Sequence, residues 1–332
     1  MTGSNRKPIL KTGALLLCFL LTISGCTQAK RVERASEVGY FFNTVVTITL
    51  YDADEALMPE IWDACRRYEK ILSKTIEDSD VDRLNRADGS PVTVEPETWS
   101  ILARAKELSA KTGGAFSVTI APISALWDFT GGTKRMPSDE ERLALLHLID
   151  DSQIELMDHN QVRLPAGMMI DLGGIAKGYI ADQIAAMVQP RCAGAICNFG
   201  GNVYVIGSKP DGSAFRVGIR DPQGEEGSIK CVLTVRDTSV VTSGVYERWF
   251  ELDGKVYHHI LDPQTGLPSE SDVAGATIVT GSSMDADALA TACVVLGSAE
   301  SIKLLESMGL PGLLILRDGS VLTTTDFPYL NN

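Results

Sequence analysis

The sequence predicts an α+β fold in which mixed and antiparallel sheets pack against helices. Short stretches with alternating apolar residues are separated by turn dipeptides such as Asp253-Gly254 and Asp318-Gly319, which favour hairpins. Longer segments between them carry apolar residues at helical spacing. Because hairpins join antiparallel neighbours, these two patterns together argue against a purely parallel sheet. The 332 residues, 44% of them apolar, are enough to bury a sizeable core.

In the first half of the chain the patterns predict a strand followed by helices and a hairpin. The strand is expected at 40–51, helices at 57–72 and 97–111, and a helix start at 137. A capped helical turn that runs into a loop is expected at 79–89, and the hairpin at 154–157 and 161–164. In the second half strands and helices alternate. Strands are expected at 164–170, 195–199, 203–206, 215–219, 231–235, 249–257, 276–280 and, as the last one, 312–316, with helices at 176–188, 286–296 and 299–307.

Residues 1–25 are expected to form a signal peptide, because Arg6, Lys7 and Lys11 precede an apolar run at 14–23. The tetrapeptide that ends in Cys26 resembles a bacterial lipobox, in which cleavage before the cysteine is followed by lipid attachment to its sulfur. We therefore expect a lipid anchor at the extracytoplasmic face of the bacterial cell membrane. The alternative is an uncleaved anchor, for which the apolar run is shorter than the roughly 20 residues that span a bilayer.

The domain organisation that follows has three parts. Residues 26–37 form a polar tether, and residues 38–328 form one folded domain with a possible lobe boundary near 125–150. The net charge of -13 disfavours nucleic acid as a partner. Five cysteines remain after the signal peptide and Cys26, an odd number, so a disulfide scaffold is not expected and most should be small buried apolar residues. Their spacing with the histidines does not indicate a zinc site either.

The segment DLGGIAKGY, residues 171–179, has the composition of an anion site. We expect Asp171 at the end of the strand 164–170 and Lys177 in the first turn of the following helix. Gly173 and Gly174 lack a Cβ, so backbone N–H groups can approach a phosphate, and a helix N-terminus favours negative charge. The alternative is that the Gly-Gly pair is only a tight strand-to-helix connection.

A second segment, residues 284–297, predicts a buried helix that is apolar nearly all round. Asp287 and Thr291 stand four residues apart on one face of it, so their oxygens can address one point. That pattern suits a hard cation such as Mg²⁺. The alternative is local capping: Asp285 or Asp287 would satisfy free N–H groups at the helix start, and Thr291 would bond back to a carbonyl.

Two adjacent histidines, His258 and His259, end an apolar strand just before the turn Asp262-Pro263-Gln264-Thr265-Gly266. One of them should face inward. An inward histidine can be a hydrogen-bonded core residue, or it can act as a base or ligand, and both interpretations stay open.

Five motifs, DLGGIAKGY, FGGN, VTSGVYER, HHILDPQTGLP and DADALATA, follow one another within residues 171–297. Taken together they resemble the ApbE family of FAD:protein FMN transferases, in which they occur in the same order. The stretches 68–85 and 111–122 and the lipobox extend the likeness over nearly the whole chain. The resemblance implies a two-lobed, T-fold-related architecture with a central flavin cleft.

The resemblance also implies an activity and a set of site residues. The activity is Mg²⁺-dependent transfer of FMN from FAD, the substrate, to a threonine hydroxyl of acceptor flavoproteins, with release of AMP; membrane reductase subunits are family-level expectations for the acceptor. Catalytic roles fall on Asp287, Lys177 and, as candidate base, His259. The implied metal ligands are Asp287 and Thr291 through their side chains and Gly174 and Ala290 through their carbonyls. The implied FAD contacts are Phe42, Thr75, Ala115, Phe116, Ser117, Asp171, Lys177, His259 and Leu261.

This chain departs from the family's usual pattern at three of these positions. It has Phe42-Asn43-Thr44 where Met-Gly-Thr is common, Thr75 where an aromatic residue often covers the flavin, and Ser117 where aspartate is usual. All three lie at the flavin or adenine ends, so the pyrophosphate and metal end keeps the family's residues. Two other functions remain open: an FAD pyrophosphatase that gives FMN and AMP, and a lipid-anchored flavin-binding protein without turnover.

Overall fold

An eight-stranded sheet forms the centre of the molecule in the computed structural model, which describes residues 1–3, 31–129, 135–225, 227–325 and 327–328. The strand order is β1-β2-β6-β7-β10-β13-β14-β15, and every neighbouring pair is antiparallel. The bounds are β1 Arg31–Phe41, β2 Thr44–Asp54, β6 Gly194–Phe199, β7 Asn202–Gly207, β10 Thr238–Gly244, β13 Val273–Thr280, β14 Gly312–Leu316 and β15 Val321–Thr323. The predicted α+β class is therefore confirmed.

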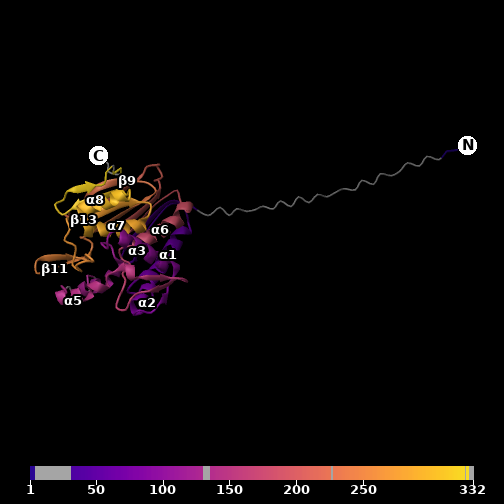
Figure 1. Ribbon diagram of the computed structural model, residues 1–332. Coiled ribbons are helices and arrows are strands. Elements are labelled where there is room, and N and C mark those ends of the chain that lie inside the picture. The colour runs from indigo at the N-terminus through magenta and orange to yellow at the C-terminus, as the bar shows by residue number, and fades with distance from the viewer. Residues whose placement is uncertain (4–30, 130–134, 226, 326, 329–332) are drawn as a thin grey trace.

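Helices cover one face of this sheet (Figure 1). Helix α7 (Ser283–Leu296) packs on β10 and β13, and α6 (Ala176–Val188) packs beside it on β6 and β7. Further out, α1 (Leu57–Leu72) contacts α6, and α3 (Pro96–Lys111) contacts α7. The core on this face is large and includes Val241 and Ile278 from the sheet. The remaining helices are α2 Asp80–Arg86, α4 Ala121–Trp127, α5 Asp139–Leu145 and α8 Ser298–Ser307.

A two-stranded ribbon covers part of the opposite face. Strands β8 (Phe215–Arg220) and β9 (Ile229–Val235) pair with each other, and Val217 of β8 joins a second apolar cluster with Val240 and Val279 of the sheet. Because successive strand residues point to opposite faces, Val240 belongs to this cluster and Val241 to the helical side.

Two smaller sheets and a third apolar cluster complete the fold. Strands β3 (Val92–Thr93), β4 (Glu155–Met157) and β5 (Gln161–Arg163) form one small sheet, and β11 (Trp249–Leu252) pairs with β12 (Lys255–His258). The third cluster contains Ile123 and Trp127 of α4, Phe250 of β11 and Leu261. Figure 1 places α5 and β11 together at one end of the molecule, away from α8 and β9. A lobe boundary near 125–150 stays a prediction.

Five expectations about elements were wrong. The segment 249–257, expected as one strand, is the hairpin β11–β12, which turns at Asp253-Gly254 as that dipeptide favours. Residues 31–37, expected in a tether, begin β1, whose mostly exposed and polar side chains do not show strand alternation in the sequence. The single strand expected at 40–51 is a hairpin, because Phe42 and Asn43 both take positive φ (55° and 56°) and reverse the chain. Residues 164–170 form no strand, so Asp171 does not follow one. Strand β15 follows β14, so 312–316 is not the last strand.

The cysteines follow the prediction. Cys65, Cys192, Cys197, Cys231 and Cys293 are all free, and Cys65, Cys197 and Cys293 are buried. The predicted signal peptide and Cys26 lie outside the described residues. Among the residues that are described, no helix is both long and apolar enough to cross a membrane.

Candidate functional site

The candidate site is built where the start of α6 meets the first turns of α7. Helix α7 is buried almost all round, and the side chain of Asp287 within it is only 2% exposed. Its Oδ2 accepts a hydrogen bond from the backbone N–H of Gly178 at 3.0 Å, and its Oδ1 lies 3.4 Å from Lys177 Nζ. Asp287 thus joins the two helices, because a buried carboxylate needs a hydrogen-bond partner and Asp287 finds this partner on α6.

The closeness of the two helices depends on glycine at position 178. A Cβ there would lie 2.2 Å from the carbonyl oxygen of Ser283, which is backbone and cannot move aside. Since real Cβ atoms do not approach an oxygen so closely, α6 can reach α7 only with Gly178 in place. This contact is what brings Lys177 to Asp287.

Of the two interpretations of Asp287, capping of its own helix is excluded by the geometry. Ser282 is the N-cap of α7 and accepts from Asp285 N, while Asp285 forms a two-point ion pair with Arg104. Asp182 on α6 accepts from the N–H groups of Ser283 and Met284 at 2.7 and 3.0 Å. The free N–H groups of α7 are therefore satisfied without Asp287, and its carboxylate is directed to α6.

Thr291 lies one turn further along α7 and faces the same junction. Its hydroxyl donates to the carbonyl of Asp287 at 3.1 Å, the back-bond that was one expectation, and lies 3.3 Å from Ser243 Oγ. A Cβ on Gly174 would lie 3.5 Å from Thr291 Oγ1 and 3.3 Å from the Phe116 ring. Gly174, Phe116 and Thr291 therefore meet at one point, while Ala290 is buried beside Thr291 on α7.

These oxygens fit a hard divalent cation. No group of three or more His, Cys, Asp or Glu side chains is placed to hold a metal within the described ranges. The oxygen donors at the junction are instead one carboxylate, one hydroxyl and nearby backbone carbonyls, the hard ligands that Mg²⁺ prefers. Lys177, at 3.4 Å, is a long and weak partner for Asp287, so the carboxylate retains capacity for a stronger positive charge.

Asp171 is anchored by a lysine that the motif did not reveal. Lys74 Nζ lies 2.6 Å from Asp171 Oδ2, and Gly173 N donates to Oδ1 at 2.8 Å. Burial opposes ionisation, but the charge and hydrogen bond of Lys74 and the Gly173 N–H hold the pKa of Asp171 below its ordinary value. Thr75 follows Lys74 in the chain, so the loop at 73–75 and the Gly173-Gly174 turn form one wall.

The segment 115–117 is held by a buried acid. Asp151 accepts hydrogen bonds from Ser117 Oγ at 2.6 Å and from the N–H groups of Val118 and Thr119. Val118 O in turn accepts from Asp171 N at 2.8 Å. Ala115 and Phe116 are buried, and Asp151 fixes the backbone that carries Phe116 toward Gly174.

Phe42 lies in the tight turn between β1 and β2. Its backbone N–H donates to Glu69 Oε1 of α1 at 2.7 Å, which ties the turn to that helix. Asn43 in the same turn reaches a separate cavity, described below.

The two histidines have different environments. His258 is the inward residue: it is 4% exposed, its Nε2 lies 3.0 Å from Ser269 O, and its buried Nδ1 has no hydrogen-bond partner among the described residues. His259 is half-buried, and its Nδ1 lies 3.3 Å from Arg248 O. Burial, then the charge of Arg248, lowers the pKa of His259 to about 3, and burial lowers that of His258 to about 4. Both rings are therefore neutral at pH 7.

Leu261 does not share the polar surroundings of the other predicted FAD contacts. It is buried in the third apolar cluster with Ile123 and Trp127, and pairs through its backbone with Pro268. The prediction for Leu261 is therefore not supported by a contact with the junction. Leu261 is near the site in sequence, two residues after His259, while its side chain packs in the third apolar cluster.

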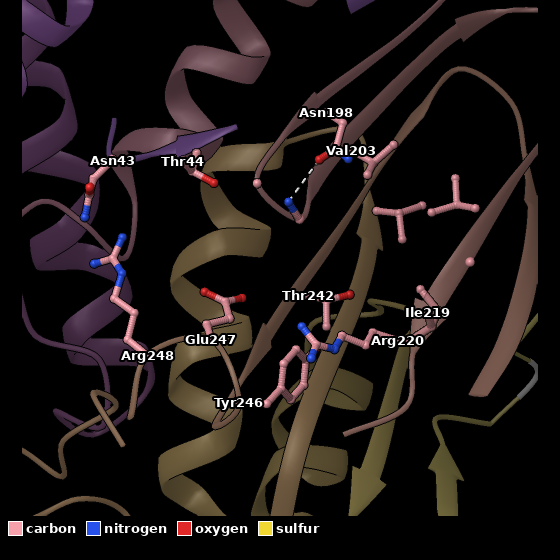
Figure 2. A pocket seen from close by; sticks show the side chains of 15 residues that line it. Asn43, Thr44, Asn198, Val203, Ile219, Arg220, Thr242, Tyr246, Glu247 and Arg248 are labelled. Carbon is pink, nitrogen blue, oxygen red and sulfur yellow. Dashed lines mark hydrogen bonds between the residues drawn. The ribbon is translucent and has the colours of Figure 1, made fainter. Parts of the chain in front are cut away.

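A cavity of about 420 Å³ lies beside this junction (Figure 2). It is lined by Thr44, by the Gly200-Gly201 turn, by one strand of the β8–β9 ribbon and by Tyr246, Glu247 and Arg248. Loss of surrounding water raises the pKa of Glu247, although part of its side chain is open to solvent; Lys177 opposes the rise and Asp287 adds to it. Glu247 is thus within electrostatic reach of both the cavity and the Lys177–Asp287 pair.

Comparison with known proteins decides the family. The ApbE family profile matches residues 42–314, most of the chain. The chain belongs to the ApbE family. A curated relative from Treponema pallidum, named FAD:protein FMN transferase, is 36% identical over 330 residues, with 92% of this chain and 91% of the relative covered. One of the same name from Klebsiella pneumoniae is 34% identical over 257 residues, which cover 76% of this chain and 79% of the relative.

Solved ApbE structures share the fold. The ApbE protein of Thermotoga maritima has a TM-score of 0.83 at 31% identity, covering 89% of this chain and 98% of that one. The flavin transferase ApbE of Vibrio cholerae has a TM-score of 0.82 at 28% identity, covering 90% and 99%. The expected ApbE architecture is therefore confirmed over nearly the whole length of both proteins.

Proposed function

We propose that this chain transfers the FMN part of FAD to a threonine hydroxyl of acceptor flavoproteins in a reaction that depends on Mg²⁺. It is an enzyme of the FAD:protein FMN transferase class, as its curated relatives are named. In this reaction a P–O bond forms between the acceptor oxygen and the FMN phosphorus. The bond from that phosphorus to AMP breaks, AMP leaves with the electron pair, and the hydroxyl proton passes to a base.

The observation that carries the proposal is the convergence of Lys177 and Asp287 at the α6–α7 junction. Transfer from a pyrophosphate is favoured by positive groups placed next to its negatively charged bridging and terminal oxygens. Lys177 Nζ supplies one positive charge, and the dipole of α6, which begins at Ala176, adds a partial one. Asp287 lies 3.4 Å from the ammonium group of Lys177, which also donates to Gly173 O at 3.2 Å, and it aligns the start of the helix through Gly178.

Asp287 and Thr291 would hold Mg²⁺, with Gly174 and Ala290 as the proposed carbonyl ligands. When bound, Mg²⁺ would neutralise charge on the pyrophosphate and polarise the phosphorus that is attacked. Thr291 is already oriented by its bond to Asp287 O, so the hydroxyl oxygen faces Gly174. The proposed FAD contacts near the metal end are Asp171 and Lys177, which lie on the two sides of the Gly173-Gly174 turn.

His259 is the proposed base for the acceptor hydroxyl. Arg248 O fixes its Nδ1 as the protonated nitrogen, which leaves Nε2 with a free lone pair. The lowered pKa keeps this lone pair available at every physiological pH, although it also makes the ring a weak base. Phe42, Thr75, Ala115, Phe116, Ser117 and Leu261 remain the proposed contacts for the rest of FAD.

The location is also proposed. Cleavage before Cys26 and lipid attachment would place the enzyme at the extracytoplasmic face of the cell membrane, beside membrane-bound or extracytosolic acceptors. β1 begins at Arg31, so only a few residues would separate Cys26 from the folded domain.

The experiment that tests the function is incubation of the enzyme with FAD, with and without Mg²⁺, and with proteins of the source bacterium as acceptors. Transfer predicts a fluorescent protein band in a denaturing gel and AMP in equal amount. Free FMN and AMP without a fluorescent band would indicate the pyrophosphatase alternative. Stoichiometric FAD that stays uncleaved after Mg²⁺ addition would overturn catalysis and support a flavin-binding protein.

A further inference from the structure

The cavity beside the junction follows the unpaired edge of β8. Four successive residues of that strand line it, Val217 to Arg220, and no residue of β9 does. Because successive side chains point to opposite faces of a strand, a space that touches four in a row runs along the strand's edge and not over one face. β9 pairs with one edge of β8, so the cavity lies along the other.

That edge offers backbone groups for pairing. In the described part of the chain β8 has β9 as its single ladder partner. The free edge faces a space of about 420 Å³, within the roughly 300–1,000 Å³ of typical binding pockets. A strand edge that faces such a space can accept an extended peptide, whose main chain continues the ladder.

The far end of this edge is positively charged in an acidic protein. Arg220 lies over the Tyr246 ring at 4.7 Å, and among the residues described neither Arg220 nor Arg248 forms an ion pair, although both interact electrostatically with Glu247. The guanidinium groups flank Glu247, as Figure 2 shows. A peptide that carries a carboxylate next to its reacting residue would complement this end.

The cavity lies on the ribbon side of the sheet, and it approaches the helical side past the end of β10, where Glu247 stands. Thr242 of β10 lines it, and the next residue, Ser243, lies 3.3 Å from Thr291 on the helical side of the sheet. Glu247 lines the cavity and interacts electrostatically with Lys177 and Asp287. None of the nine proposed FAD contacts lines it, so the space remains available when FAD occupies those residues.

We propose that this cavity is the acceptor site: an extended, carboxylate-bearing segment of the acceptor protein adds to β8 as a strand, with its threonine hydroxyl presented past Glu247 to the phosphate. The inference rests on the proposed function, since it names the site of that reaction's second substrate. Arg220 and Arg248 bind the segment's carboxylate. Glu247, which interacts electrostatically with Lys177, orients the hydroxyl.

The test compares two charge reversals on one strand. Arg216 and Arg220 both point outward from β8, but Arg216 does not line the cavity, so Arg216→Glu is the matched control for Arg220→Glu. With the purified acceptor that becomes fluorescent with the unaltered enzyme, Arg220→Glu should raise KM for the acceptor at least tenfold and leave KM for FAD within twofold. Arg216→Glu should change neither, and Arg220→Lys should recover most of the loss.

Backbone protection provides a second readout that needs no variant. Amide hydrogen exchange of the enzyme with FAD should slow at residues 217–220 when the acceptor is added. An unchanged acceptor KM in Arg220→Glu, or unchanged exchange at 217–220, would overturn the acceptor site while transfer itself persists. A raised KM for FAD would assign the cavity to the nucleotide, and the absence of any fluorescent acceptor would overturn the proposed function on which the site rests.

Discussion

At the residue scale, the proposed chemistry depends on how Asp287 of α7 directs its two oxygens to two groups at the start of α6. One oxygen takes the Gly178 N–H and the other faces Lys177, so a single buried carboxylate orients both a cation and a helix start. The i,i+4 spacing of Asp287 and Thr291 could be predicted from the sequence, since helical periodicity alone puts them on one face. Their orientation toward α6 could not, because it depends on packing between helices more than 100 residues apart in the chain.

Some partners carried no local sequence signal. Lys74 pairs with Asp171 across 97 residues, and Asp151 fixes the loop at Ser117 across 34. Glu247 stood within the VTSGVYER motif, but only the cavity shows what its carboxylate faces. Long-range pairs of this kind arise from the tertiary fold, so one sequence without its structure cannot assign them.

His259 gives a prediction for the pH dependence of the reaction. Its pKa of about 3 means that the ring is neutral from pH 5 upward, so the rate of FMN transfer should show no His259 ionisation near pH 6.5. His259→Ala should lower kcat about 10²- to 10⁴-fold and make the remaining rate rise with hydroxide concentration. The measurement is kcat from pH 5 to 9, with exposed His147→Ala as control. A His259→Ala profile of unchanged shape would remove the residue from the mechanism.

At the element scale, the site exists because α6 and α7 pack with glycine between them. Both helices could be predicted from apolar periodicity, and the structure confirms them with ends shifted by at most a few residues. β1 could not be predicted in the same way, because an edge strand with exposed polar residues on both faces has no alternation to detect.

Replacing Gly178 by alanine should separate the two helices. The new Cβ would meet Ser283 O at 2.2 Å, so we expect about 1–3 kcal/mol loss of unfolding free energy, together with loss of FMN transfer as Lys177 moves from Asp287. Denaturant unfolding and the transfer assay measure the two effects. Gly281→Ala is the control, because a Cβ there meets nothing within 4 Å and its φ is ordinary. Equal stability of the two variants would show that the helix contact is not tight.

At the scale of the whole molecule, one antiparallel sheet separates two surfaces with different tasks. Helices on one face build the proposed phosphate and metal site, and the β8–β9 ribbon on the other borders the cavity. The α+β class and most strands could be predicted from hairpin turns and alternation. The order of strands could not, because it places β2 beside β6 and β10 beside β13 across long connections.

The stability of the whole molecule should fall in mild acid, partly through His258. Burial lowers the pKa of His258 to about 4, against about 6.5 when unfolded, and no residue in the described part of the chain offers its buried Nδ1 an acceptor for an added proton. The unfolded chain therefore binds a proton first, so this contribution is fully present above pH 6.5 and is lost as the pH falls toward 4. At pH 5 the loss is about 2 kcal/mol.

The check is the unfolding free energy at pH 7 and pH 5 for the unaltered chain, His258→Asn and the control His147→Asn. His258→Asn should lose less stability between the two pH values than the unaltered chain, and His147→Asn the same amount. Burial raises the pKa of Asp182 to about 6, so protonation of this residue adds stability as the pH falls. This contribution is the same in all three proteins and cancels when their losses are compared. Equal losses in all three proteins would mean that His258 is protonated in the fold.

The claim that Lys177, Asp287 and Thr291 form the metal and pyrophosphate site is tested most directly by the rate of FMN transfer at limiting Mg²⁺ in Asp287→Ala. Asp285→Ala is the matched control, since its carboxylate lies on the same helix but pairs with Arg104. We predict that Asp287→Ala loses at least 100-fold in rate while Asp285→Ala stays within a fewfold of the unaltered enzyme. Full transfer by Asp287→Ala at limiting Mg²⁺ would contradict the account.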